Sequence, residues 1–427
     1  MGTVSVNPER TIAELRELAA LTSDERGAQR VAWTPTWAKA RAWFRGKLAE
    51  LPVQVEQDEA GNLWATLAGA SPQALIMGSH LDSVPDGGWL DGCLGVLTGL
   101  EVLRRIDAQY NHRPLVTVRL VDWADEEGAR FGRSLFGSSA VAGRLNVAWV
   151  SRLVDTKGVR LVDAVRDFGV TVETAERASR QIAGACAYLE LHIEQGPVLE
   201  SLGLPLGAVI GCYGIERHQV IFTGTAAHAG GFPMHLRRDA FLSAARFALA
   251  VREIAKRHGG VGTNGRVRNA PDIPTAVAGE CAITVDMRHM DAQRLQTMLM
   301  EAQTASAQIA AEEGTTVSWR TIYQSPPQPF DPLLIELCET SIREVNAGRA
   351  HRLPSGPGHD AIEMAWAGVP TVMMFVQSVN GLSHNPQEDT QPEHIALAVR
   401  AFDRLAEKVI AWLAKDQRAA DSKAATS

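Results

Sequence analysis

The chain has 427 residues, which at about 150 residues per domain suggests two or three domains. Its formal net charge of -7 argues against nucleic acid or an anionic membrane as a partner, because both require a basic surface. No apolar run approaches the roughly 20 residues that span a bilayer, and no signal-peptide core is visible. Five scattered cysteines without a CxxC pair favour free thiols in a reducing compartment, so we expect a cytoplasmic protein.

Strand and helix patterns alternate through the first half of the chain. Residues 74–77 and 115–121 are short apolar, β-branched runs, as in buried strands. Residues 94–106 carry apolar side chains at helical spacing, which predicts a helix packed on the sheet. Residues 187–194 alternate apolar and polar side chains, which predicts a strand with one polar face.

The middle of the chain differs in character from its flanks. Strand-like and helical segments alternate there, at residues 219–223, 240–257, 282–288 and 292–311. Residues 371–376 then predict a further strand, and residues 393–414 a long amphipathic helix. We therefore expect a large α/β domain formed by residues 1–214 and 326–427, with an inserted α+β domain at residues 215–325.

Five short stretches are rich in residue types that bind metal ions. They are Gly78–Val84, Gly87–Gly92, Asp125–Phe131, Leu191–Gly196 and Gly381–Pro386. His80 and the pair Glu126 and Glu127 follow predicted strands, and open α/β sheets place their active sites at such strand ends.

These residue types suit a metal-dependent hydrolytic site. Histidine nitrogens and carboxylate oxygens are the ligands of catalytic zinc, and five of them with one bridging carboxylate can hold two ions. A hydroxide shared by ions roughly 3.5–4 Å apart is a strong nucleophile at neutral pH. The adjacent Glu126 and Glu127 offer one carboxylate as a ligand and one as a general base. Asp82 can hydrogen-bond His80 and fix its tautomer.

Each stretch also has a purely structural explanation. A lone histidine such as His80 is more often structural, and the neighbouring Glu126 and Glu127 can simply be solvated. Asp91 can cap the helix that follows it, and His192 can lie on the polar face of its strand. The order and context of all five stretches together favour the metal site.

Seven motifs in this order resemble the hydantoinase/carbamoylase family of amidases. They are GSHLDSV, GGWLDG, DEEGARF, LHIEQGPVLE, HAGGFPM, SGPGHDA and GLSHNPQED. The family includes N-carbamoyl-L-amino-acid hydrolases, allantoate amidohydrolases and β-ureidopropionases, within the dinuclear-zinc clan that also contains aminoacylases and some carboxypeptidases. The resemblance runs from about Thr11 to Leu413, nearly the whole chain.

The resemblance implies a dinuclear-zinc, exopeptidase-like catalytic domain that cleaves the ureido or amide bond of a small carboxylate. Candidate substrates are N-carbamoyl-L-amino acids and ureido carboxylates such as allantoate. An aminoacylase or dipeptidase on the same scaffold, acting on N-acyl amino acids, is the nearest alternative. A non-catalytic, metal-stabilised binding protein is the alternative from another class.

The resemblance also implies which residues bind two divalent ions. Zinc is expected, with manganese, cobalt or nickel as alternatives. The ligands of one ion are His80, Asp91 and His192. Those of the other are Asp91, Glu127 and His384, so Asp91 bridges. Glu126 is the expected general base toward a metal-bridging hydroxide, and Asp82 the residue that orients His80.

The inserted domain is implied to act as both lid and dimerisation domain, so we expect a homodimer. On it, His228 is expected to stabilise the developing oxyanion in the active site of the partner subunit, and Arg288 to clamp the substrate carboxylate. Gln195 and His359 are expected to complete the substrate pocket. The alternation of residues 282–288 puts Arg288 on a polar face, where an ordinary surface arginine is the simpler explanation.

Two positions depart from the family pattern. The family usually carries an asparagine that contacts the substrate carboxylate, in a stretch shortly before the strand of Arg288, and Thr275 stands in its place here. The usual HAGTTPM is HAGGFPM, which puts Phe232 where a small polar residue is expected. Both changes fall in the expected substrate pocket, so they bear on substrate choice rather than on metal binding.

Overall fold

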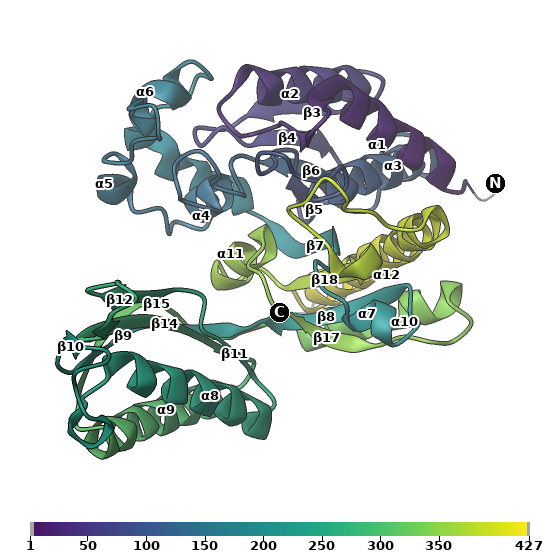
Figure 1. The fold of residues 1–427 in the computed structure, drawn as a ribbon. Helices are drawn as coiled ribbons and strands as arrows, with labels where there is room; N and C mark the ends of the chain where they lie inside the picture. The colour runs from purple at the N-terminus through teal and green to yellow at the C-terminus, as the bar shows by residue number, and fades with distance from the viewer. Residues whose placement is uncertain (1–3, 425–427) are drawn as a thin grey trace. The chain divides into compact units, whose positions relative to one another are not determined.

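A computed structural model describes residues 4–424 and divides the chain into two compact units (Figure 1). Unit 1 comprises Met1–Ile210 and Phe330–Ser427, and unit 2 comprises Gly211–Pro329. Unit 2 lies within the sequence of unit 1, and the mixed α/β composition agrees with the predicted fold class. The predicted boundaries are residues 215 and 325, and the role of unit 2 as a lid and dimerisation domain stays a prediction.

The sheet of unit 1 has parallel strands at its centre and antiparallel ones toward its edges. Neighbouring strands follow the order β8-β18-β7-β5-β6-β4-β3, and β5, β6, β7 and β18 run parallel to one another. The strands are β3 (Gln54–Gln57), β4 (Leu63–Leu67), β5 (Ala74–His80), β6 (Thr117–Trp123), β7 (Ala185–Ile193), β8 (Leu206–Cys212) and β18 (Thr371–Val376), with β17 (Arg352–Ser355) paired to β8. A separate short ladder joins β1 (Ser23–Asp24) and β2 (Gly27–Ala28).

The helices of unit 1 pack on this sheet and on one another. The long ones are α1 (Pro8–Thr22), α2 (Pro35–Leu48), α3 (Cys93–Gln109), α10 (Pro332–Val345) and α12 (Pro392–Ala424). The short ones are α4 (Phe136–Val141), α5 (Val147–Val150), α6 (Leu161–Arg166), α7 (Val198–Ser201) and α11 (Asp360–Trp366), with 3-10 turns η1 (Val172–Ile182) and η3 (Val379–Gly381). α3 contacts β5, β6 and β7, and α12 contacts α1, α3 and α10. The predicted helix at residues 94–106 is α3, and the predicted closing helix is α12.

β7 contains the predicted alternating segment, and the structure adds that the polar face of this strand is buried. Its polar residues Glu190 and His192 are as buried as its apolar ones, at 0% and 1% exposure. β7 lies between β5 and β18 in the sheet, and central parallel strands are covered on both faces. The alternation therefore marks polar groups enclosed in the protein rather than a solvated surface.

Unit 2 is a sheet with two helices packed against it. The strand order is β11-β14-β9-β15, and β12 also pairs with β14. The elements are β9 (Gly214–Thr223), β10 (Ala227–His228), η2 (Met234–Leu236), α8 (Ala240–His258), β11 (Val261–Thr263), β12 (Val267–Ala270), β13 (Ala276–Val277), β14 (Glu280–His289), α9 (Ala292–Glu312), β15 (Thr316–Ser325) and β16 (Gln328–Pro329). α8 and α9 share a core with β9 and β14 that includes Phe222, Phe247, Val285 and Met298.

The ends of α8 follow ordinary capping chemistry. The Asp239 side chain accepts hydrogen bonds from the Phe241 and Leu242 N–H groups, which have no partner within the helix. The helix ends at Gly259, whose φ of 71° is left-handed and costs glycine little. The predicted helix at residues 240–257 matches α8 because its sequence carries both signals.

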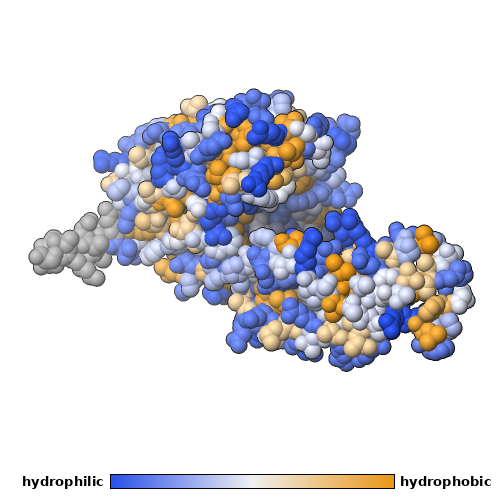
Figure 2. Space-filling model, turned by 90° about the vertical axis from the view of Figure 1, so that its left-hand side faces the viewer, coloured by the Kyte–Doolittle hydropathy of each residue, from blue (hydrophilic) through white to orange (hydrophobic). Residues whose placement is uncertain are grey.

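The surface mixes polar and apolar side chains, and apolar ones form small groups on the face shown in Figure 2. None of the helices within residues 4–424 combines the length and apolar character needed to span a bilayer.

Candidate metal and active site

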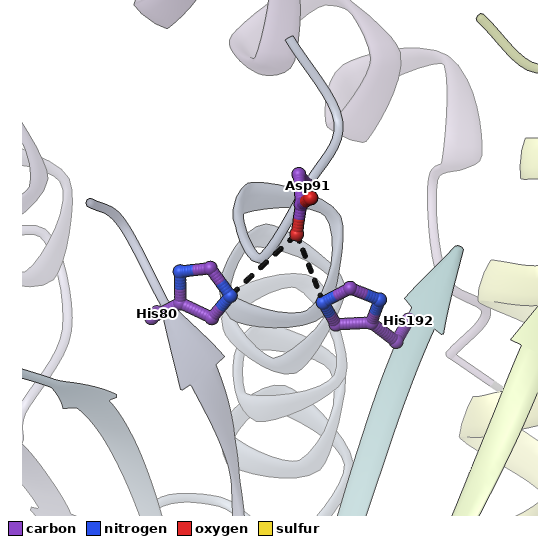
Figure 3. A group of neighbouring side chains, drawn as sticks. All are labelled: His80, Asp91 and His192. Carbon is purple, nitrogen blue, oxygen red and sulfur yellow. Dashed lines mark ion pairs between the residues drawn. The ribbon is translucent and has the colours of Figure 1, made fainter. Parts of the chain in front are cut away.

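The first group of predicted ligands meets at the carboxyl ends of β5 and β7 (Figure 3). His80 is the last residue of β5 rather than a residue beyond it, and His192 lies near the end of the adjacent β7. Asp91 precedes α3, and its Oδ1 lies 3.1 Å from His192 Nε2 and 3.6 Å from His80 Nε2. All three side chains are buried. The sheet therefore presents two imidazoles and one carboxylate to a common point.

The second group uses the other oxygen of the same carboxylate. Asp91 Oδ2 lies 3.5 Å from His384 Nε2, which lies 3.2 Å from Glu127 Oε2. The ligand atoms of each group fall within 4.8 Å of one another, and Asp91 belongs to both. The structure thus brings the five predicted ligands into the two predicted groups.

The donor set fits divalent metal ions. His192 Nε2 is buried and faces Asp91 Oδ1 at 3.1 Å, and His80 Nε2 lies 3.6 Å from the same oxygen. Two imidazole nitrogens converging on one carboxylate oxygen are the donor types that catalytic zinc uses. Burial disfavours a charged His80, but Glu126, Asp82 and Asp91 outweigh it and raise the His80 pKa well above its usual range. Three carboxylates close to one histidine give the site negative charge that a bound cation would balance.

Asp91 does not cap α3 with its side chain. The capping residue is Gly92, with a φ of 66°, and no side chain accepts a hydrogen bond from the first turn. The alternative role of Asp91 as a helix cap is therefore wrong. Gly92 also gives room to the site, because a Cβ there would lie 2.4 Å from Cε1 of His80.

Glu126 and Glu127 follow β6 and reach different partners. Glu126 Oε2 lies 3.7 Å from His80 Nε2, whereas Glu127 approaches His384. Glu126 belongs to neither ligand group, and burial raises its pKa well above the usual range for a carboxyl, with Asp360 adding to the effect. A buried carboxyl group that lies beside the metal ligands without being one of them is the arrangement expected of a general base.

Asp82 contacts His80 through its main-chain carbonyl rather than through the predicted side-chain hydrogen bond. His80 Nδ1 contacts the main-chain carbonyl of Asp82 at 3.1 Å, while the Asp82 carboxylate is 3.5 Å away. That carboxylate instead accepts hydrogen bonds from the N–H groups of Glu126 and Glu127, at 3.2 and 3.1 Å. Asp82 therefore orients His80 through its backbone and the two glutamates through its side chain.

Gln195 and His359 both lie beside the ligand groups. Gln195 Nε2 donates to Asp91 Oδ2 at 2.8 Å and to Ser383 Oγ at 3.1 Å. The His359 ring centroid is 4.4 Å from that of His192, and its buried Nε2 has no hydrogen-bond partner. Burial and the neighbouring His192 lower the His359 pKa well below its usual range. A neutral, unpartnered ring nitrogen next to the ligands suits the predicted substrate contact.

His228 and Thr275 lie close together in unit 2. β10 pairs with β13, and the Ala229 N–H donates to the Thr275 carbonyl at 2.8 Å. His228 Nδ1 accepts hydrogen bonds from Gly230 and Gly231 N–H, at 3.2 and 3.1 Å. In the neutral ring the proton is therefore on Nε2, which leaves an N–H donor of the kind that an oxyanion needs.

Arg288 shares a carboxylate with a second arginine of unit 2. Asp286 Oδ1 accepts from Arg288 Nε at 2.8 Å, and Asp286 Oδ2 accepts from Arg288 Nη2 at 3.3 Å and from Arg217 Nε at 2.7 Å. Asp286 and Arg217 are direct partners across β14 and β9. The Arg288 guanidinium is thus oriented on the sheet face opposite the buried core residues Val285 and Met287. Phe232, the departure from HAGTTPM, is half-buried, and its carbonyl accepts from Arg237 Nε.

Comparison with known protein families identifies the family of the chain. Residues 76–408 match the model of Peptidase family M20/M25/M40. The chain belongs to this family. The match covers more than half of the chain and includes every predicted ligand, and it agrees with the resemblance found in the motifs.

This M20 family member is similar to several amidohydrolases along most of its length. The allantoate amidohydrolase of Escherichia coli K12 is 36% identical over 384 residues, covering 88% of this chain and 91% of that protein. An N-carbamoyl-L-amino-acid amidohydrolase of Paenarthrobacter aurescens is 32% identical, covering 93% and 98%. A crystal structure of a hydantoinase/carbamoylase family amidase from Burkholderia multivorans has a TM-score of 0.86 at 31% identity, covering 95% and 98%. These findings confirm the recognised amidase family and the fold.

Three buried or half-buried polar residues of this M20 family member are not among the predicted site residues. Glu190 accepts from Ser79 Oγ, from Tyr188 OH and from the Ala361 N–H at the start of α11. Ser383 and Glu388 contact the loop and carboxylate of Asp91. Ser383 and Glu388 stand inside the motif GLSHNPQED, and Glu190 is two residues before the predicted ligand His192; these positions are the only signal for them in the sequence.

Proposed function

We propose that this enzyme hydrolyses the ureido or amide C–N bond of a small carboxylate substrate. The candidates are N-carbamoyl-L-amino acids and related ureido carboxylates such as allantoate. The observation that carries the proposal is the pair of ligand groups sharing Asp91, with Glu126 beside them, in a chain that resembles amidohydrolases along nearly its whole length.

Two divalent ions, zinc first among them, are the proposed cofactors. His80, Asp91 and His192 would hold one, and Asp91, Glu127 and His384 the other. Such ions, when bound, activate water and polarise the scissile carbonyl. Manganese, cobalt and nickel accept the same donors, so the proposal rests on the donor set and not on one element.

The chain's own groups then move protons and bind the substrate. Glu126 accepts the proton of the attacking water on its carboxylate and delivers it to the leaving nitrogen. The Nε2–H of His228 of the partner subunit donates to the oxyanion that develops on the substrate carbonyl. Arg288 binds the substrate carboxylate with a fork of N–H donors, and Gln195, Thr275 and His359 are the proposed further contacts.

The proposal includes a cytoplasmic homodimer. The five cysteines form no disulfide in the structure and four of them are buried, which suits a reducing compartment. Unit 2 is proposed to pair two copies of the chain and to close over the substrate.

The test is a product assay with metal-loaded enzyme. Ammonia release is measured on N-carbamoyl-L-amino acids, allantoate and ureidopropionate, and free amine is measured in parallel on N-acyl amino acids. Ammonia release that chelation abolishes and metal restores is the expected result. Free amine without ammonia would favour the aminoacylase or dipeptidase alternative, and tight carboxylate binding without any hydrolysis would favour a non-catalytic binding protein.

A further inference from the structure

The shared carboxylate of Asp91 has a fixed orientation. Its Oδ1 faces His192 and His80, while its Oδ2 faces His384. A free aspartate side chain rotates between staggered conformers, and most of them would turn one oxygen away from one of the two groups. Something in the protein must hold this carboxylate so that each oxygen serves its own group.

Glu388 holds the backbone of that residue. Its Oε1 accepts hydrogen bonds from the N–H groups of Leu90 and Asp91, at 3.0 Å each. Glu388 is only 2% exposed, and a Cβ at Gly88 would lie 2.1 Å from the same Oε1. The glutamate is thus enclosed against the loop that carries Asp91.

Ser383 contacts the side chain of Asp91. Its Oγ lies 2.8 Å from Asp91 Oδ2 and 2.9 Å from Glu388 Oε2, so its one hydroxyl proton is within reach of both carboxylates. Gln195 Nε2 donates to both Ser383 Oγ and Asp91 Oδ2. Ser383 also immediately precedes His384, so one short segment positions both Oδ2 and the histidine that faces it.

We infer that Ser383 and Glu388 are positioning residues that divide the Asp91 carboxylate between the two ligand groups and thereby determine occupancy of the group formed with Glu127 and His384. The inference rests on the ligand assignment of the proposed function. The other group depends less on them, because His80 and His192 are fixed on adjacent strands. Residues that support a metal ligand typically change metal affinity by about 10- to 100-fold when removed.

The experiment measures metal binding by the full-length protein in a zinc buffer series, with calorimetry for affinities and elemental analysis for stoichiometry. Ser383→Ala and Glu388→Leu are expected to weaken the second ion by about 10- to 100-fold and to leave the first unchanged. Glu388→Gln keeps an acceptor for the two N–H groups and is expected to stay close to wild type. Asp389→Asn is the matched control, because this exposed carboxylate contacts Trp89 Nε1 and the Thr390 N–H instead. Thermal melts of the metal-free variants check folding.

The outcomes separate this inference from the proposed function. Folded Ser383→Ala and Glu388→Leu that bind two ions with wild-type affinity overturn the inference, even if the wild type hydrolyses ureido compounds. Loss of both ions together overturns it as well, because the effect would then not be specific to one group. A wild type that binds fewer than two ions overturns the inference and the dinuclear assignment. Selective loss of the second ion supports the inference even where no substrate is turned over.

Discussion

Glu126 differs from its neighbour Glu127 in one respect that matters for chemistry: it is next to the ligand groups without belonging to them. Glu126→Gln keeps the shape of the side chain but cannot accept the proton of water. We expect kcat to fall by about 10²- to 10⁴-fold while two ions remain bound. Glu127→Gln is the informative comparison, because it removes a ligand and should lose an ion. Full activity of Glu126→Gln would refute its role as the base.

Arg288 presents a planar fork, and a lysine in its place keeps the charge but not the two parallel donors. Asp286 orients the guanidinium by accepting from both Nε and Nη2, an orientation that a lysine cannot keep, so we expect Arg288→Lys to raise KM for a carboxylate substrate. The expected increase is roughly 10-fold or more, with a smaller change in kcat. Arg257→Lys is a matched control, since Arg257 pairs with Glu301 between the two helices. An unchanged KM in Arg288→Lys would argue that this residue is the ordinary surface arginine.

The sequence is informative about ligands and less so about what holds them. His80, Asp91 and His192 are predicted as ligands because the motifs that carry them resemble, in the same order, those of the hydantoinase/carbamoylase amidases. The contact of Ser383 with Asp91 joins positions 292 residues apart, and no local pattern encodes it. The partners of the Asp82 carboxylate likewise depend on which backbone N–H groups the fold turns toward it.

At the scale of the element, the start of α3 couples the backbone to the site. Gly92 has a φ of 66°, and a Cβ there would meet the His80 ring. Gly92→Ala is therefore expected to displace that imidazole and to reduce metal affinity and activity together. Gly143→Ala is the matched control, with a φ of 68° and nothing within 4 Å of the added Cβ. In Gly143→Ala the left-handed backbone conformation should lower the free energy of unfolding by roughly 1–2 kcal/mol. We expect this as a lower melting temperature with activity retained. Equal behaviour of the two variants would contradict the steric argument.

Element positions are predicted well where local signals are complete. Residues 371–376 form β18 as expected, and the helices of unit 2 begin at aspartate caps that are visible in the sequence. β7 shows the limit of the method. Its alternation indicates a polar face, but only the neighbouring strands decide whether that face meets solvent or a buried site.

At the scale of the whole molecule, α8 carries apolar side chains that unit 2 does not bury. Leu242 and Leu249 are 44% and 57% exposed, and their spacing of seven residues places them on one face of the helix. Exposed leucines aligned in this way are often covered by another protein surface. In a proposed homodimer that pairs through unit 2, this face is a natural place for the contact.

The dimer and its interface can be tested by introducing one charged side chain on the exposed apolar face of α8. Light scattering after size exclusion should give the wild type a mass of about twice 46.1 kDa. Leu249→Glu would bring an unpaired carboxylate into the interface, which is costly to desolvate, so we expect this variant to elute as a monomer. Met300→Glu on α9 is the matched control, because Met300 is equally exposed, at 58%, on the other helix. A dimeric control with a monomeric Leu249→Glu would locate the contact on α8. A monomeric wild type would contradict the dimer itself, and a dimeric Leu249→Glu would move the interface to another face of the chain.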